Sequence, residues 1–104
     1  MDHVAINVND LEWNIKFFED VFGMTVTKEG TADNGKRQVW LSGGIQLVPY
    51  DGELVQGTMN HLGIAVDDVD AVLAKADKYN VTHLEKGWNW IVIPTGLLIE
   101  VLGA

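Results

Sequence analysis

The sequence predicts an α+β fold built from two tandem modules, each with the order strand, helix, strand, strand, strand. First, the stretch His3–Asp10 (HVAINVND) recurs as His61–Asp68 (HLGIAVDD), and the two copies align without a gap. Second, each copy alternates as a half-buried strand does. Third, each copy ends in an aspartate that precedes apolar residues at helical spacing. We therefore predict one domain of 104 residues, with modules over residues 1–50 and 59–104 and a linker over residues 51–58.

The first copy of the repeat predicts an opening strand followed by a helix. Val4, Ile6 and Val8 share one face of the strand, and the opposite face carries a histidine beside small residues, which is typical of a cavity wall. An aspartate at the start and a glycine at the end are suited to cap the helix. Apolar residues at helical spacing predict one stripe along it, made of Leu11, Ile15, Phe18 and Phe22.

Three further strands complete the first module. Residues 24–28 predict a short strand, and residues 29–36, rich in Gly, Asn and Asp, predict a loop. Residues 37–41 and 45–49 predict a hairpin, because the glycines of residues 42–44 accept the positive φ that tight turns need.

The second module repeats this order. Asp68 is suited to cap a helix that ends near Asn80, and a strand over residues 81–84 follows. Residues 88–93 and 97–102 then pair around a Pro-Thr-Gly turn. The helical residues expected to face inward are Val69, Val72, Leu73 and Ala76.

Composition restricts the function classes. Fifteen acidic and seven basic residues give a formal charge of −8, and Arg37 is the only arginine, so we expect no nucleic-acid partner. A small substrate that is neutral, or whose charge is met by a metal, fits better. There is no cysteine, so disulfides and thiolate metal sites are excluded. No apolar run is long enough to span a membrane and the first residues do not form a signal sequence, so we expect a cytoplasmic protein with no membrane partner.

Four polar residues fall at two strand positions, each used once per module. His3 and His61 open the first strands, and Gln46 and Glu100 interrupt the apolar pattern of the last strands. Each has an ordinary interpretation by itself: a solvated terminal histidine, an exposed glutamine, a glutamate paired with a histidine. Together, two imidazoles, an amide oxygen and a carboxylate predict a site for one divalent ion, either Zn, Ni, Co, Mn or Fe. Such an ion also compensates Glu100, whose charge is costly to bury among apolar neighbours.

The chain resembles the vicinal oxygen chelate superfamily, which includes glyoxalase I, methylmalonyl-CoA epimerase, extradiol dioxygenases and the fosfomycin and bleomycin resistance proteins. The resemblance rests on the His3–Asp10 pattern, the aromatic helix that ends at Gly23, the echo at His61–Asp68 and Glu100 in the last strand. It implies a glyoxalase-like fold, in which two βαβββ modules form a curled mixed sheet around a metal-binding cavity. The ligands that it implies are His3, Gln46, His61 and Glu100.

The resemblance also implies a reaction in which the metal chelates two neighbouring oxygens of a small substrate and stabilises an enolate-like intermediate. The leading hypothesis is a lyase or isomerase in which Glu100 is both ligand and base, whereas the amide of Gln46 binds the metal only. One alternative is an Fe(II) extradiol-type dioxygenase that uses His3, His61 and Glu100. Another is a non-catalytic small-molecule binding or resistance protein, a branch that usually lacks the ligand set.

Aromatic residues and module size lead to further expectations. Trp40, Trp88 and Trp90 are candidates for lining the pocket, and cross-strand packing is the alternative for the two on one strand. His83 has no counterpart in the repeat and is predicted to be a surface residue. Because small modules expose sheet edges and apolar surface, and because the family is usually dimeric, we expect a homodimer. The short linker is compatible with a cavity formed within one chain or between two.

Overall fold

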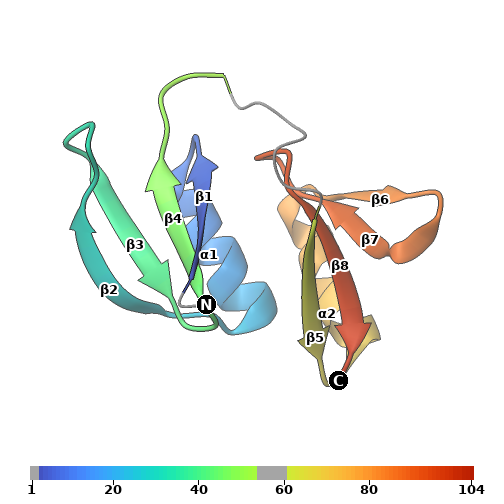
Figure 1. Ribbon diagram of the computed structural model, residues 1–104. Helices are drawn as coiled ribbons and strands as arrows, with labels where there is room; N and C mark the ends of the chain where they lie inside the picture. Colours follow the sequence, from blue (N-terminus) through green and yellow to red (C-terminus); the bar gives the residue numbers. More distant parts are fainter. Residues whose placement is uncertain (1–2, 54–60) are drawn as a thin grey trace. The chain divides into compact units, whose positions relative to one another are not determined.

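A computed structural model of the chain describes residues 3–53 and 61–104 (Figure 1). It divides into two compact units, residues 1–54 and 55–104. Residues 54–58 of the predicted linker lie outside the described residues. Each unit has one α-helix and a four-stranded mixed sheet, in the order βαβββ. The prediction of an α+β fold with two tandem βαβββ modules is confirmed.

The first unit is a sheet with the strand order β1-β4-β3-β2. β1 is parallel to β4, and the other neighbouring strands are antiparallel. Ile6, Val8, Val39 and Leu47 alternate along the strands and are buried, which makes one face of the sheet the core. The elements are β1 (Val4–Val8), α1 (Leu11–Phe22), β2 (Val26–Thr31), β3 (Arg37–Leu41) and β4 (Ile45–Pro49).

Helix α1 begins and ends as predicted but buries a different face. The Asp10 side chain accepts a hydrogen bond from the backbone N–H of Trp13 at 3.0 Å, and Gly23 ends the helix at φ 68°. Of the predicted stripe only Phe18 is buried. The adjacent Phe17 is also buried, so the middle of the buried face lies between Phe17 and Phe18. The buried residues of α1 are Asn14, Phe17, Phe18 and Val21.

Strand β2 lies later in the chain than predicted. Met24 does not start the strand, because its backbone N–H donates to the Phe18 carbonyl at 3.0 Å and completes the helix cap. Pairing with β3 then continues as far as Thr31 opposite Arg37, which shortens the predicted loop to residues 32–36.

The second unit repeats the sheet, with the strand order β5-β8-β7-β6. Asp68 caps α2 by accepting from the Ala71 N–H at 3.0 Å, and Asn80 has the left-handed conformation expected after the helix, at φ 63°. Ile91, Ile99 and Val101 are fully buried. The elements are β5 (Leu62–Val66), α2 (Val69–Ala76), the 3-10 helix η1 (Asp77–Tyr79), β6 (Thr82–Leu84), β7 (Gly87–Val92) and β8 (Leu98–Gly103).

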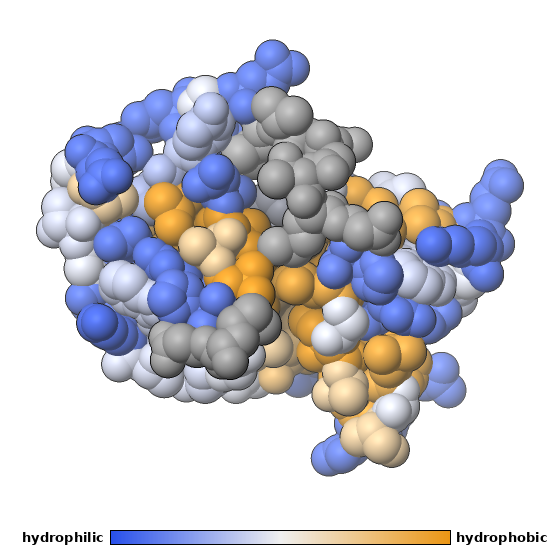
Figure 2. Space-filling view, viewed as in Figure 1, coloured by the Kyte–Doolittle hydropathy of each residue, from blue (hydrophilic) through white to orange (hydrophobic). Residues whose placement is uncertain are grey.

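The second unit covers its sheet less completely than the first. Helix α2 has 8 residues, against 12 in α1. The apolar residues of β5, Leu62, Ile64 and Val66, are accordingly only half-buried. On the opposite face, which carries Glu100, Leu102 is exposed. Figure 2 shows hydrophobic residues at the surface of this unit, over β5 and β8. Neither α-helix within residues 3–53 and 61–104 is long and apolar enough to cross a membrane.

Candidate metal centre

The second unit brings two of the predicted ligands together. Glu100 pairs with Gly63 across the parallel β5 and β8 strands, and His61 lies just before β5. Atom Nε2 of His61 lies 3.6 Å from Oε1 of Glu100. The side chains are 32% and 23% exposed, respectively, so both are accessible from one face of the sheet. Ile99 lies on the buried face, as the alternation in the sequence predicts.

The first unit places the two equivalent residues on the equivalent strands. Gln46 pairs with Ala5 across the parallel β1 and β4 strands, and His3 precedes Ala5 by two residues, so the strand period places it on the same face. His3 is exposed, whereas Gln46 is buried with 9% of its surface accessible. The same two strand positions therefore carry the candidate donors in both units.

A further residue, Gln38, fixes the amide of Gln46. Atom Nε2 of Gln46 donates to Oε1 of Gln38 at 3.1 Å, and Nε2 of Gln38 donates to the Thr31 carbonyl at 3.3 Å. This hydrogen bond engages one N–H of the Gln46 amide, and Oε1 is the atom through which an amide binds a metal. Gln38 is not among the residues predicted from the sequence, although its position two residues before Trp40 in β3 places the two on one face.

A tryptophan lies beside each half of the candidate centre. Trp40 is the cross-strand partner of the candidate ligand on β4, and Trp90 is the partner of the one on β8. The rings of His61 and Trp90 meet edge-to-face with centroids 4.8 Å apart, and those of His3 and Trp40 do so at 6.4 Å. Two of the three tryptophans proposed to line the pocket therefore contact the candidate ligands.

A lysine lies over each of these indoles. The ammonium of Lys28 is 4.7 Å from the ring centroid of Trp40, and that of Lys86 is 3.7 Å from the centroid of Trp90. Both distances are within the range of a cation–π interaction. The lysines recur in the sequence as the histidines do, since 28 − 3 and 86 − 61 both give 25. That spacing is the signal that could have identified them.

The donor set fits a divalent metal in its chemistry and, in the second unit, in its spacing. Two donor atoms that each bind a Zn-sized ion at about 2.1 Å lie about 3 to 3.5 Å apart, close to the separation of His61 and Glu100. Within the described part of the chain, no three His, Asp or Glu side chains come together. The four-ligand centre stays a prediction.

Trp88 and His83 form a separate cluster in the second unit. Their rings stack with centroids 3.6 Å apart. Nε2 of His83 lies 2.6 Å from Oδ1 of Asp77, and Nδ1 lies 2.6 Å from the Trp88 carbonyl oxygen. The His83 side chain is only 11% exposed, so the prediction of a surface residue is wrong, because β6 places it against η1. Trp88, 64% exposed, stacks its ring on His83.

The only arginine is committed to carboxylates. Arg37 bridges Glu29 and Glu12, with 2.8 Å between its Nη1 and Oε1 of Glu12. The hydrogen bond with Glu29 raises the pKa of Arg37 above its ordinary value, so the group is charged at every working pH. Its charge is already met by two side chains, which leaves it poorly suited to anchor an anionic substrate.

Known proteins resemble the whole chain. It is 31% identical to YwbC, an uncharacterized protein of Bacillus subtilis strain 168, over 118 aligned positions that cover 96% of this chain and 94% of the other. The trypanothione-dependent glyoxalase I of Leishmania major matches with a TM-score of 0.79 and 29% identity, over 99% of this chain and 85% of that one. FosX of Listeria monocytogenes, solved with Mn(II) and sulfate, matches in fold, with a TM-score of 0.80 and 17% identity over 100% and 91% of the two chains.

The family assignment follows from the sequence match. Residues 1–86 match the family model of the glyoxalase/bleomycin resistance protein/dioxygenase superfamily. The repeat, the two βαβββ units and the similar solved structures agree with it. The chain belongs to the glyoxalase/bleomycin resistance protein/dioxygenase superfamily, the group to which the vicinal oxygen chelate resemblance pointed.

Proposed function

We propose that the protein is a metal-dependent lyase or isomerase of the glyoxalase type, acting on a small oxygenated substrate, with both units working as one domain. The observation that carries the proposal is the 3.6 Å approach of His61 to Glu100, repeated in position by His3 and Gln46 in the other unit. These four residues would hold one divalent ion. When bound, such an ion supplies a Lewis acid that stabilises negative charge on neighbouring substrate oxygens.

Glu100 is the proposed base. Its carboxylate takes a proton from a carbon next to a carbonyl group, and the electron pair of the broken C–H bond moves toward the carbonyl oxygen. In an α-hydroxycarbonyl substrate the hydroxyl proton moves to the former carbonyl oxygen, and Glu100 returns its proton to the former carbonyl carbon, which gives the isomerised product. His61, 3.6 Å away, positions the carboxylate. The Gln46 amide does not exchange a proton at neutral pH, so Glu100 is the one carboxylate base among the four proposed ligands.

The dioxygenase alternative is weakened by the histidine count. An extradiol reaction would call for a further acid–base group in the pocket in addition to the ligands. The chain has three histidines, and two of them are candidate ligands. The third, His83, has both ring nitrogens engaged by Asp77 and the Trp88 carbonyl. The binding-protein alternative is weakened because all four ligand positions carry suitable donors.

Metal content tests the proposal. Protein purified without chelators is expected to contain about one Zn, Ni, Co or Mn ion per chain, and the E100A variant much less. The H83Q variant is the control, because His83 lies in the separate cluster on Asp77 and should leave the metal content unchanged. Iron in place of these metals would favour the dioxygenase, and no affinity for any divalent ion would favour a binding protein.

Hydrogen–deuterium exchange tests the role of the base. The metal-loaded protein in D2O is incubated with a panel of α-hydroxycarbonyl compounds, and loss of the C–H signal is followed by NMR. Exchange is the partial reaction common to lyases and isomerases that use an enolate. Exchange in the wild type but not in E100Q supports the assignment, and exchange in neither would contradict it.

We also propose a homodimer. The edge strands β1 and β5 each have one neighbour within their own sheet. The apolar residues of β5 are only half-buried, and burying apolar surface favours association. Sedimentation equilibrium should show a species of twice the chain's mass, and a monomer at high micromolar concentration would refute the dimer.

A further inference from the structure

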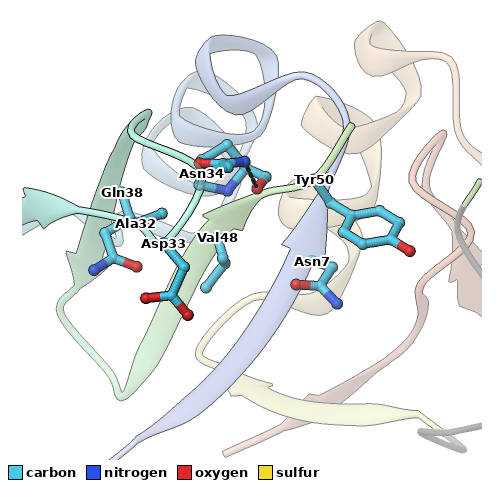
Figure 3. Close-up of a pocket in the computed structure, with 8 residues that line it drawn as sticks. Asn7, Ala32, Asp33, Asn34, Gln38, Val48 and Tyr50 are labelled. Carbon is cyan, nitrogen blue, oxygen red and sulfur yellow. Dashed lines mark hydrogen bonds between the residues drawn. The ribbon is translucent and has the colours of Figure 1, made fainter. Parts of the chain in front are cut away.

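A pocket lies within the first unit, on the sheet face that carries Gln46. It has a volume of about 390 Å³ and is formed by the ends of β1 and β4, the start of β3 and the loop that follows β2. Figure 3 shows Asp33 and Gln38 on one side, Asn7 and Tyr50 on the other, and Val48 between them. Asn34, which belongs to this loop, also lines the pocket.

The pocket is close to the candidate metal ligand. Val48 follows Gln46 by two residues in β4, which places both on one face about 7 Å apart. Asn7 is the cross-strand partner of Val48. Gln38 lines the pocket and also accepts the hydrogen bond from Gln46. A molecule with its oxygens at Gln46 therefore reaches the pocket with a chain of about five atoms.

Hydrogen bonds hold the walls of the pocket in place. Nδ2 of Asn34 donates to the Pro49 carbonyl at 3.0 Å, which ties the loop to the end of β4. Nδ2 of Asn9 donates to the carbonyls of Tyr50 and Gly52, at 3.0 Å each, which ties down the segment that carries the Tyr50 ring. The pocket is therefore preformed, which lowers the ordering cost of binding.

The lining is negative and rich in hydrogen-bonding groups. Among the described residues that line the pocket, Asp33 carries the only full charge, and none is Lys or Arg. The cations that follow in the sequence are committed elsewhere, Lys36 to Asp51 and Arg37 to Glu29. An anionic group would therefore meet a repulsive carboxylate, whereas an ammonium would meet Asp33, amide oxygens and an aromatic ring.

We propose that this pocket binds a protonated primary amine at the far end of the substrate. As a substrate subsite this rests on the proposed function, but the selectivity of the pocket belongs to the first unit and does not depend on a metal. The substrate class is then an oxygenated small molecule that has an ammonium group about five atoms from the two oxygens of the reacting end.

Matched four-carbon probes test the charge preference without metal. The metal-free, ¹⁵N-labelled full chain is titrated with butylammonium, butanol and butyrate, and the side-chain NH₂ signals of Asn7, Asn34 and Gln38 are followed by NMR. Saturable shifts are expected with butylammonium at concentrations at least about fivefold lower than with the other two probes. Equal shifts with butanol or butyrate would overturn the proposal.

A pair of variants assigns the effect to Asp33. D33N is expected to raise the Kd for butylammonium about fivefold, because one charge-assisted hydrogen bond is lost. E19Q removes the same charge from an exposed position on α1 and should leave the Kd unchanged. The same Kd for D33N and wild type would overturn the proposal. Metal binding by the wild type without selective butylammonium binding would refute the pocket alone, and selective butylammonium binding by a wild type with no affinity for a divalent ion would refute the proposed function alone.

Discussion

Gln46 and Glu100 hold the same place in the two units, each opposite a tryptophan on the neighbouring antiparallel strand, yet only Glu100 is able to carry a proton. Duplication of one module thus gives the candidate centre a matched pair of donors with different chemistry. The amide is oriented by Gln38, and the carboxylate lies beside His61. This difference leads to the first two predictions.

The first prediction separates base from ligand at position 100. E100Q keeps the size of the side chain and an oxygen donor, so we expect the Kd for Mn(II) to rise about tenfold. The rate of C–H exchange in D2O should fall further, by about a thousandfold, because the amide cannot accept the proton. Calorimetry and NMR measure the two quantities. Exchange at the wild-type rate in E100Q would show that another group is the base.

The second prediction concerns the hydrogen bond between Gln46 and Gln38. Q38L removes the acceptor of the Gln46 N–H group, so the amide is free to rotate and the Kd for Mn(II) should rise about tenfold. Q38E keeps an acceptor oxygen and should restore most of the affinity. Equal weakening in both variants would mean that the orientation of Gln46 does not matter for metal binding.

The third prediction uses tryptophan emission. Trp90 contacts His61 with centroids 4.8 Å apart, so a paramagnetic ion such as Co(II) bound to His61 should quench it. W90F is expected to lose part of the quenching amplitude. W88F, which removes the exposed indole that stacks on His83, should retain it. Quenching that is lost in W88F and retained in W90F would place the ion elsewhere.

The fourth prediction concerns the end of helix α1. Gly23 has φ 68°, and an added Cβ would meet no atom within 4 Å, so the cost of G23A is backbone strain alone. We expect a loss of about 1 kcal/mol in the free energy of unfolding. G103A is the control, because its Cβ also meets nothing and its φ is not positive. Urea unfolding measures both, and equal stabilities for the two variants would contradict the strain argument.

Local signals in the sequence predicted most element boundaries. Strands β3 and β4 match the predicted ranges to the residue, because Gly43 and Gly44 adopt the positive φ of the tight turn that joins them. The helix caps at Asp10 and Asp68 are also local, because each aspartate accepts a hydrogen bond from a backbone N–H three residues later. Strand β2 was misplaced, since its length depends on its pairing with β3 and not on its own composition.

For the candidate site too, local features were predictable from the sequence and contacts between elements were not. In each unit, the two candidate ligands lie on the same face of the sheet. The positions of His3, Gln46, His61 and Glu100 follow from alternation within single strands and from the repeat. Contacts between strands were not predictable from that alternation. The hydrogen bond from Gln46 to Gln38, the lysines over the indoles and the burial of His83 against Asp77 all join residues on different elements.

By itself, the sequence determined the duplication, the βαβββ order of each unit and the strand positions of the candidate ligands, because strand period, helix caps and glycine turns are properties of neighbouring residues. The tertiary structure decided which face of α1 is buried, which amide is oriented and where the pocket beside Gln46 opens. These features depend on register and on the packing of large side chains from separate elements, and neither is encoded at any single place in the chain.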